Sequence, residues 1–267
     1  MPRRDLLTRA ATARTALAAA ASTRAGGPRR RSTRLAGVAR RAVWWLLDYA
    51  YVAVWQTVGF LRPGGADRFV DAPDGRGPTV VLIPGVYEPW QFMRPLAALL
   101  HRNGHPVHVV PTLGYNRGAV PEMARLVAQR IEERDLRDVV LVCHSKGGLI
   151  GKYAMLHHDP DGRILAMAAI NTPFGGSPYA RWIPVEAIRA FVPTDAVLAA
   201  LTADRVTNAR ITSISGPFDP HIPGGSDLEG ATNVHLRTPG HFRILSDRQL
   251  APTVLAVLEQ ARTAAAG

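Results

Sequence analysis

Cysteine and lysine are scarce in this sequence. Cys143 is the only cysteine, which excludes an intrachain disulfide and therefore the class of small secreted domains that disulfides hold together. Only two of the 32 basic residues are lysines, Lys146 and Lys152, and they lie six positions apart. For the Lys146 side chain we expect a solvated surface position. The alternative is that it binds an acidic lid or an acidic substrate.

Acidic residues are nearly missing from the first 41 positions. This segment holds eleven arginines and one acid, Asp5, so it carries a charge of +10 out of a total of +11. The rest of the chain is close to neutral, which argues against a nucleic-acid-binding body. We predict that 1–41 is a disordered, arginine-rich leader.

The sequence leaves the compartment open between a cytoplasmic and a membrane-associated location. Arg3 and Arg4, followed by an alanine-rich stretch, weakly suggest a twin-arginine export signal. Arg9 and Arg14 interrupt the apolar run that such a signal needs, so export remains the lesser alternative.

A long uninterrupted apolar run is also missing. The nearest candidate is 42–61 (AVWWLLDYAYVAVWQTVGFL), which has the length of a membrane span but contains Asp48 and Gln56. Its tryptophans and tyrosines are typical of a helix at headgroup depth. Three interpretations stay open: a helix packed on the catalytic domain, a peripheral membrane helix, and a true span.

The remaining sequence predicts one α/β domain over 78–263, after a linker at 62–77. Short buried runs alternate with helical stretches, which is typical of a mostly parallel central sheet with helices on both faces. The expected strands are 79–84, 106–111, 138–143, 164–170, 209–215 and 231–236. The expected helices are 91–103, 119–135, 147–157, 184–201 and 248–263.

Ser145 is the candidate nucleophile. It stands between a buried strand and a helix in the sequence Cys143-His144-Ser145-Lys146-Gly147-Gly148. Such a strand-to-helix turn exposes a serine hydroxyl and requires small neighbours, although Cys143 replaces the usual first glycine of G-x-S-x-G. The Lys146 backbone N–H, at the start of the helix, is a candidate oxyanion donor.

Candidates for the acid and the base follow later in the chain. Asp219 comes after the strand ending at Ser215, and His241 comes in a loop before the last helix, so Asp219 would orient His241 as general base. Asp227 and Asp195 are reserve acids. His221 and His235 are poorer bases, because one adjoins the acid and the other lies within a strand.

The loop after the first strand, Pro84-Gly85-Val86-Tyr87-Glu88, supplies the second oxyanion donor by position. We assign that role to the Val86 N–H, with the Tyr87 N–H next. A strand followed by an ordinary Pro-Gly turn is the plain alternative for these residues.

From about Pro78 to Gln260 the chain resembles lipase-like α/β-hydrolases, in particular bacterial lipases and esterases with an HSKGG elbow and a PGVYE-type loop. Here the matching residues are His144 to Gly148 and Pro84 to Glu88, and 171–177 resembles the segment that leads into a lipase cap. The resemblance implies an α/β-hydrolase fold, nucleophile, acid and histidine in that chain order, and ester hydrolysis without a metal or a cofactor.

A short apolar cap is expected at about 174–205. We expect Tyr87, Phe174, Trp182 and Phe191 to contact substrate, with an ordinary covering helix as the alternative for the cap.

The leading hypothesis is a serine hydrolase that cleaves small-molecule or lipid esters through an acyl-enzyme. A membrane surface could be a partner through 42–61 and the arginine-rich arm. A thioesterase or amidase on the same residues is one alternative, and a non-catalytic, membrane-associated binding protein is another.

Overall fold

The computed structural model describes residues 29–72, 77–182 and 185–266. The expected leader therefore lies outside the described residues up to position 28. The chain forms two compact units, one ending at Trp44 and one beginning at Trp45. In the described part of the first unit the Arg40 guanidinium lies 5.0 Å from the centre of the Trp44 ring.

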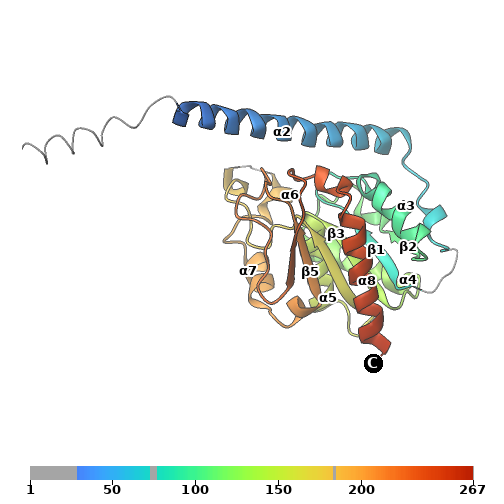
Figure 1. Ribbon diagram of the computed structural model, residues 1–267. Coiled ribbons are helices and arrows are strands. Elements are labelled where there is room, and N and C mark those ends of the chain that lie inside the picture. Colours follow the sequence, from blue (N-terminus) through green and yellow to red (C-terminus); the bar gives the residue numbers. More distant parts are fainter. Residues whose placement is uncertain (1–28, 73–76, 183–184, 267) are drawn as a thin grey trace, which may run out of the picture. The chain divides into compact units, whose positions relative to one another are not determined.

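A six-stranded, all-parallel sheet forms the centre of the second unit, in the order β2-β1-β3-β4-β5-β6 (Figure 1). This confirms the predicted fold class. The strands are β1 (Thr79–Ile83), β2 (Val107–Val109), β3 (Val139–His144), β4 (Ile164–Ile170), β5 (Ile211–Ser215) and β6 (Thr232–His235). Every residue of β3 is buried, as expected for a parallel strand covered on both faces.

Helices cover both faces of the sheet, and alternate strand residues point to each. Val80 and Leu82 belong to the apolar cluster that includes α3 and α8, whereas Val81 and Ile83 belong to the cluster that includes α4 and α5. These helices are α3 (Arg94–Arg102), α4 (Val120–Glu133), α5 (Lys146–His157) and α8 (Leu250–Ala266). The sheet therefore has a core on each side, and its carboxyl edge is free to carry the functional loops.

The cap contains two helices where the sequence pattern predicted one over 184–201. They are α6 (Glu186–Arg189) and α7 (Ala196–Ala203). Pro193 stands between them, and the Asp195 side chain caps α7 by accepting from the Leu198 N–H at 3.1 Å. Short 3-10 helices complete the connections: Asp67–Phe69, Trp90–Met93, Pro111–Leu113, Ala180–Trp182, Thr207–Arg210 and Arg243–Ser246.

The first described helix, α2, runs from Arg29 to Leu61. It begins before Ala42, so 29–41 is helical where we expected no regular structure. Arginine, alanine and leucine are good helix formers, and this tendency extends the helix beyond its apolar part. No described helix combines the length and the apolar character that crossing a bilayer requires.

Residues 45–61 of α2 belong to the same compact unit as the sheet. Tyr51, Val52 and Trp55 pack against the core cluster of α3 and α8, and Asp48 is fully buried. The Tyr51 hydroxyl donates to the Phe92 carbonyl at 2.7 Å. Within this unit, residues 45–61 therefore contact the core on the side of α3 and α8.

Candidate active site

The turn between β3 and α5 holds Ser145 in a strained conformation. Its φ of 52° and ψ of −122° lie where side chains other than glycine are rarely found. A Cβ at Gly147 would overlap the Ile83 carbonyl oxygen, and one at Gly148 would overlap the Thr172 side chain. The two glycines are therefore required by close packing of the helix start against neighbouring strand ends.

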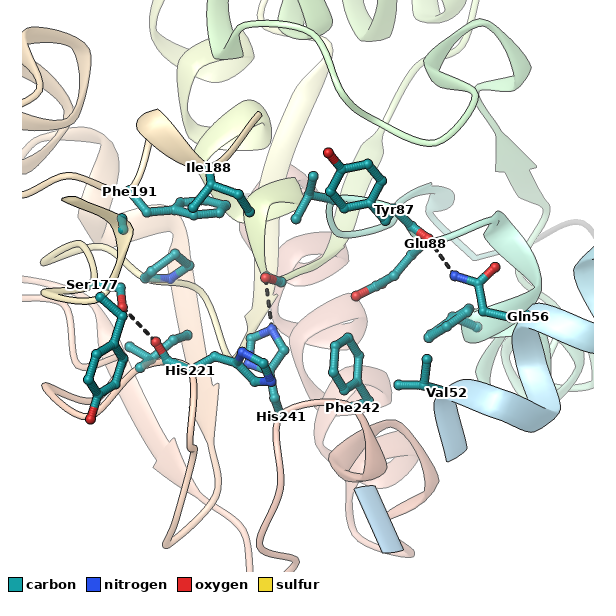
Figure 2. A pocket seen from close by; sticks show the side chains of 17 residues that line it. Val52, Gln56, Tyr87, Glu88, Ser177, Ile188, Phe191, His221, His241 and Phe242 are labelled. Atoms are coloured by element: carbon teal, nitrogen blue, oxygen red, sulfur yellow. Dashed lines mark hydrogen bonds between the residues drawn. The ribbon is translucent and has the colours of Figure 1, made fainter. Parts of the chain in front are cut away.

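Ser145, His241 and Asp219 come together at the carboxyl edge of the sheet. The His241 Nε2 lies 2.9 Å from the Ser145 Oγ, a hydrogen bond that Figure 2 marks with a dashed line. The His241 Nδ1 lies 2.6 Å from the Asp219 Oδ2. These distances are within hydrogen-bond range for both pairs. The arrangement can pass the serine proton to the imidazole while the carboxylate fixes the ring orientation.

Asp219 and His241 each stabilise the charged form of the other, so the carboxylate favours the imidazolium that forms when His241 accepts a proton. Burial alone lowers the pKa of His241, but the Asp219 carboxylate outweighs it and the pKa is raised. Burial alone raises the pKa of Asp219, but the His241 cation and hydrogen bonds hold it below its usual value. Asp219 Oδ1 also accepts from the backbone N–H groups of His221 at 2.8 Å and Ile222 at 3.1 Å.

The reserve candidates lie elsewhere or have other roles. Asp195 caps α7. Asp227 pairs with the exposed His235, with 3.7 Å between the Asp227 Oδ1 and the His235 Nε2. His221 stands beside His241, with 4.9 Å between ring centres, and burial lowers its pKa to about 4. It is therefore neutral near pH 7 and carries no competing charge.

The loop expected to supply an oxyanion donor passes directly beside Ser145. A Cβ at Gly85 would lie 3.0 Å from the Ser145 Cβ. The Tyr87 N–H donates to the Tyr115 carbonyl at 2.7 Å, whereas no oxygen in the described part of the chain accepts from the Val86 N–H. The Val86 N–H is therefore better suited than the Tyr87 N–H to donate to a ligand. The other expected donor, the Lys146 N–H, belongs to the first residue of α5.

The sequence analysis missed a buried pair beneath this loop, formed by Glu88 and His144. His144 Nδ1 lies 2.8 and 2.9 Å from the two Glu88 carboxylate oxygens, and its Nε2 lies 2.9 Å from the His241 carbonyl oxygen. The Gly85 N–H donates to Glu88 at 2.8 Å. Both ring nitrogens of His144 therefore lie within hydrogen-bond distance of buried oxygen atoms, which fixes the ring between Glu88 and the His241 backbone.

Both lysines are fully buried, which contradicts the expected surface position of Lys146. Its Nζ donates to the carbonyls of Asn116 at 3.1 Å and Gly118 at 2.6 Å. Lys152 donates to the carbonyls of Leu201 and Asp204 at the end of α7. An ammonium satisfied by carbonyl oxygens can leave water, so these lysines join α5 to the loop before α4 and to the cap.

An apolar cavity of about 260 Å³ opens onto Ser145 and His241. Figure 2 shows Val52 and Gln56 of α2 on one side of it and Ile188 and Phe191 of the cap on another. The other lining residues are Val86, Tyr87, Glu88, Phe92, Ser145, Pro173, Ser177, Tyr179, Ala180, His221, Ile222, His241 and Phe242.

Two of the four expected substrate contacts line this cavity, Tyr87 and Phe191. Phe174 does not, because it is buried in the core cluster of α4 and α5. Trp182 also does not, since its side chain is 74% exposed on the cap. Sequence hydrophobicity marks a cap residue as apolar but does not show which way it faces.

Glu88, His144 and His241 offer donor atoms within 4.8 Å of one another. Each of these side chains already has close partners. Glu88 contacts the Gly85 N–H and the His144 ring, and His144 also contacts the His241 carbonyl oxygen. The His241 ring contacts the Ser145 hydroxyl and Asp219. The group is accounted for as a hydrogen-bond network, and it gives no reason to invoke a metal.

Comparison with known proteins agrees with this architecture. Residues 80–262 match the model of the alpha/beta hydrolase family. The chain therefore belongs to the alpha/beta hydrolase family. No curated protein sequence matches it.

Solved structures share the fold at low sequence identity. The lipase BlEst2 of Bacillus licheniformis has a TM-score of 0.58 at 17% identity, over 71% of this chain and 95% of that one. A carboxylesterase of the thaumarchaeon Nitrososphaera gargenis has a TM-score of 0.54 at 14% identity, over 72% and 94%. A bacterial membrane phospholipase A has a TM-score of 0.51 at 14% identity, over 88% and 99%.

Proposed function

We propose that the protein is a serine hydrolase that cleaves carboxylic esters. Ser145 is the nucleophile, His241 is the general base, and Asp219 is the carboxylate that orients His241. The observation that carries this proposal is the hydrogen-bonded series Ser145–His241–Asp219 opening onto an apolar cavity. A non-catalytic binding protein would have no need for a strained serine joined to a buried imidazole and carboxylate.

In the proposed reaction, His241 Nε2 takes the Ser145 proton as Oγ attacks the ester carbonyl carbon. The backbone N–H groups of Val86 and Lys146 donate to the oxyanion of the tetrahedral intermediate, aided by the positive end of α5. The C–O bond to the alcohol breaks and His241 returns the proton to it. Water then attacks the acyl-enzyme by the same steps and releases the acid.

The cavity favours an ester with an apolar acyl group of modest size. Its volume of about 260 Å³ is near the lower end of the roughly 300–1,000 Å³ typical of small-molecule sites. Phe92, Ile188, Phe191 and Phe242 are apolar walls that suit a hydrocarbon chain. A thioester fits the same site, so the leaving group has to be determined by experiment.

We further propose that the substrate is a lipid ester taken from a membrane surface. An exposed apolar row supports this, because Leu46, Val54 and Leu61 recur along the outer side of 45–61 and are 71%, 56% and 68% exposed. The arginine-rich segment before it would favour anionic headgroups. Co-sedimentation with anionic but not zwitterionic vesicles, lost on changing Leu46 and Val54 to serine, would support this. Equal recovery of both proteins in the supernatant would refute it.

The test of the proposed chemistry is a substrate panel. It comprises p-nitrophenyl esters from acetyl to palmitoyl, with matched thioesters and anilides, assayed with wild type and Ser145→Ala. We expect ester turnover that disappears in the variant and peaks at short to medium acyl chains. Faster thioester turnover would reassign the leaving group, and turnover that survives in a folded Ser145→Ala protein would refute the assigned nucleophile.

A further inference from the structure

Asp48 of α2 is fully buried, and its carboxylate binds the backbone on which the proposed general base sits. Oδ2 accepts from the His241 N–H at 2.9 Å. Oδ1 accepts from the N–H groups of Phe242 and Arg243, each at 2.8 Å. One acid in an apolar helix thus satisfies three successive amides about 190 positions later in the chain.

The loop is shaped to admit this carboxylate. Gly240 has a φ of 119°, and a Cβ there would lie 2.5 Å from Asp48 Oδ1. A side chain at position 240 would therefore be strained by its backbone conformation and would displace the carboxylate. The Gly240 N–H is also bonded, to the Phe218 carbonyl at 2.7 Å, which anchors the loop next to Asp219.

The same residue, His241, is held from its other side. His144 Nε2 lies 2.9 Å from the His241 carbonyl oxygen, and Asn171 Nδ2 donates to that oxygen at 3.0 Å. The His241 N–H and C=O groups are thus both fixed by buried side chains, so its backbone has little freedom. The imidazole position follows from that backbone, because Nδ1 and Nε2 must reach Asp219 and Ser145 at once.

Resting on the proposed function, we propose that Asp48 is a positioning residue for His241, and that residues 45–61 are therefore a working part of the active site. Asp48 acts through the amides of 241–243 and touches neither substrate nor the reacting atoms. A displacement of about 1 Å at a catalytic group can lower the rate about 100-fold, so such anchoring has a direct catalytic effect. Val52 and Gln56 on the same helix line the cavity, which joins the helix to the site a second time.

The charge of Asp48 affects the pH dependence of kcat/KM, which would not change if Asp48 had a purely structural role. The groups that face His241 are the anions Asp219, Glu88 and Asp48, together with His144 and the neutral His221. Each anion favours the imidazolium, so removing the Asp48 charge lowers the pKa of His241. At low pH His241 is protonated and cannot act as a base, so kcat/KM falls on the acid side of its pH profile. A lower pKa of His241 moves this acid limb to lower pH.

The experiment compares Asp48→Asn and Asp48→Glu with wild type on a short-chain p-nitrophenyl ester. Asp48→Asn keeps the shape, removes the charge and turns a donor toward the amides. We expect kcat to fall about 10- to 100-fold, with KM within about 2-fold and the acid limb at lower pH. Asp48→Glu keeps the charge but displaces it, so kcat should fall while the acid limb stays in place.

Asp159→Asn is the matched control, because Asp159 also accepts from backbone N–H groups, those of Arg163 at 2.7 Å and Ile164 at 3.2 Å, but does so at the start of β4, at the opposite edge of the sheet from the 240–243 loop. It should lower the melting temperature while leaving kcat and the pH profile unchanged. Wild-type values of kcat and pH profile in Asp48→Asn, or an equal fall of kcat in Asp159→Asn, would overturn the inference.

Hydrogen exchange on the wild-type protein tests the same contact without a substitution. Amides 241–243 should be strongly protected, and exchange at the rate of an open loop would refute the inference even if the variants do not fold. Failure of the proposed function gives a different result. Wild type itself would then show no ester turnover, and this inference would fall with it.

Discussion

Replacing Glu88 by glutamine should weaken both the fold and the site, because one buried carboxylate serves both. Glu88 is 2% exposed and contacts His144 at 2.8 and 2.9 Å and the Gly85 N–H at 2.8 Å. Glutamine keeps the volume but offers one acceptor, and its NH₂ group then faces a donor. The buried His144 ring also loses one of its two hydrogen-bonded oxygen partners in a site from which water is excluded.

The expected loss follows from these contacts. Hydrogen bonds to charged groups contribute about 1.5–3 kcal/mol each, and a buried polar group left without a partner costs about 1–3 kcal/mol. We therefore expect Glu88→Gln to lower the free energy of unfolding by about 3 kcal/mol. For a unit of this size that corresponds to a fall in Tm of about 6–12 °C.

The assay is thermal unfolding followed by circular dichroism, with ester turnover measured on the same samples. Glu259→Gln is the matched control, since Glu259 is an exposed residue of α8 paired with Arg262 at 2.6 Å. It should leave Tm and turnover unchanged, because exposed pairs are screened by solvent. A Glu88→Gln protein as stable and active as Glu259→Gln would refute the structural importance of the Glu88–His144 hydrogen bonds.

Three further results are expected. Asp219→Asn should lower kcat on the order of 10³–10⁴-fold and move the acid limb of kcat/KM to lower pH, since Asp219 raises the pKa of His241; an unmoved limb in a pH–rate profile would contradict this. Gly147→Ala should destabilise the protein by about 2–3 kcal/mol in urea unfolding, because the new Cβ meets the Ile83 carbonyl, and unchanged stability would count against the tight elbow. Ile188→Phe should lower kcat/KM for palmitoyl esters about 10-fold relative to acetyl esters, whereas an unchanged chain-length profile would place the acyl chain elsewhere.

The sheet was predictable because buried parallel strands are short, continuous apolar runs. Val139 to Cys143 illustrates this, since every side chain in it is buried. The cap was predicted less well, although Pro193 and Asp195 were visible signals for a break and a new helix start. The single helix over 184–201 was predicted from the spacing of apolar residues alone, without weighing Pro193, which interrupts it.

The nucleophile, acid and base were found as candidates because each follows a strand end. In a parallel sheet these ends share one edge, so chain order predicts a meeting point. The structure brings His241 within hydrogen-bond distance of both Ser145 and Asp219 along that edge.

The supporting network escaped the sequence analysis because its partners are far apart in the chain. Asp48 was interpreted only as an obstacle to membrane insertion, and its amide partners lie more than 190 positions away. Glu88 and His144 are separated by 56 positions. No local period or spacing connects such residues, although a lone acid in an apolar helix was a sign that a buried partner was needed.

The most direct test of the central claim is covalent labelling with a fluorophosphonate, followed by mass mapping of the modified peptide. The account predicts one adduct, on Ser145, formed rapidly in wild type and slowly in His241→Ala. A folded protein that takes up no label, or takes it up at another residue, would contradict the assignment of Ser145 as the activated nucleophile.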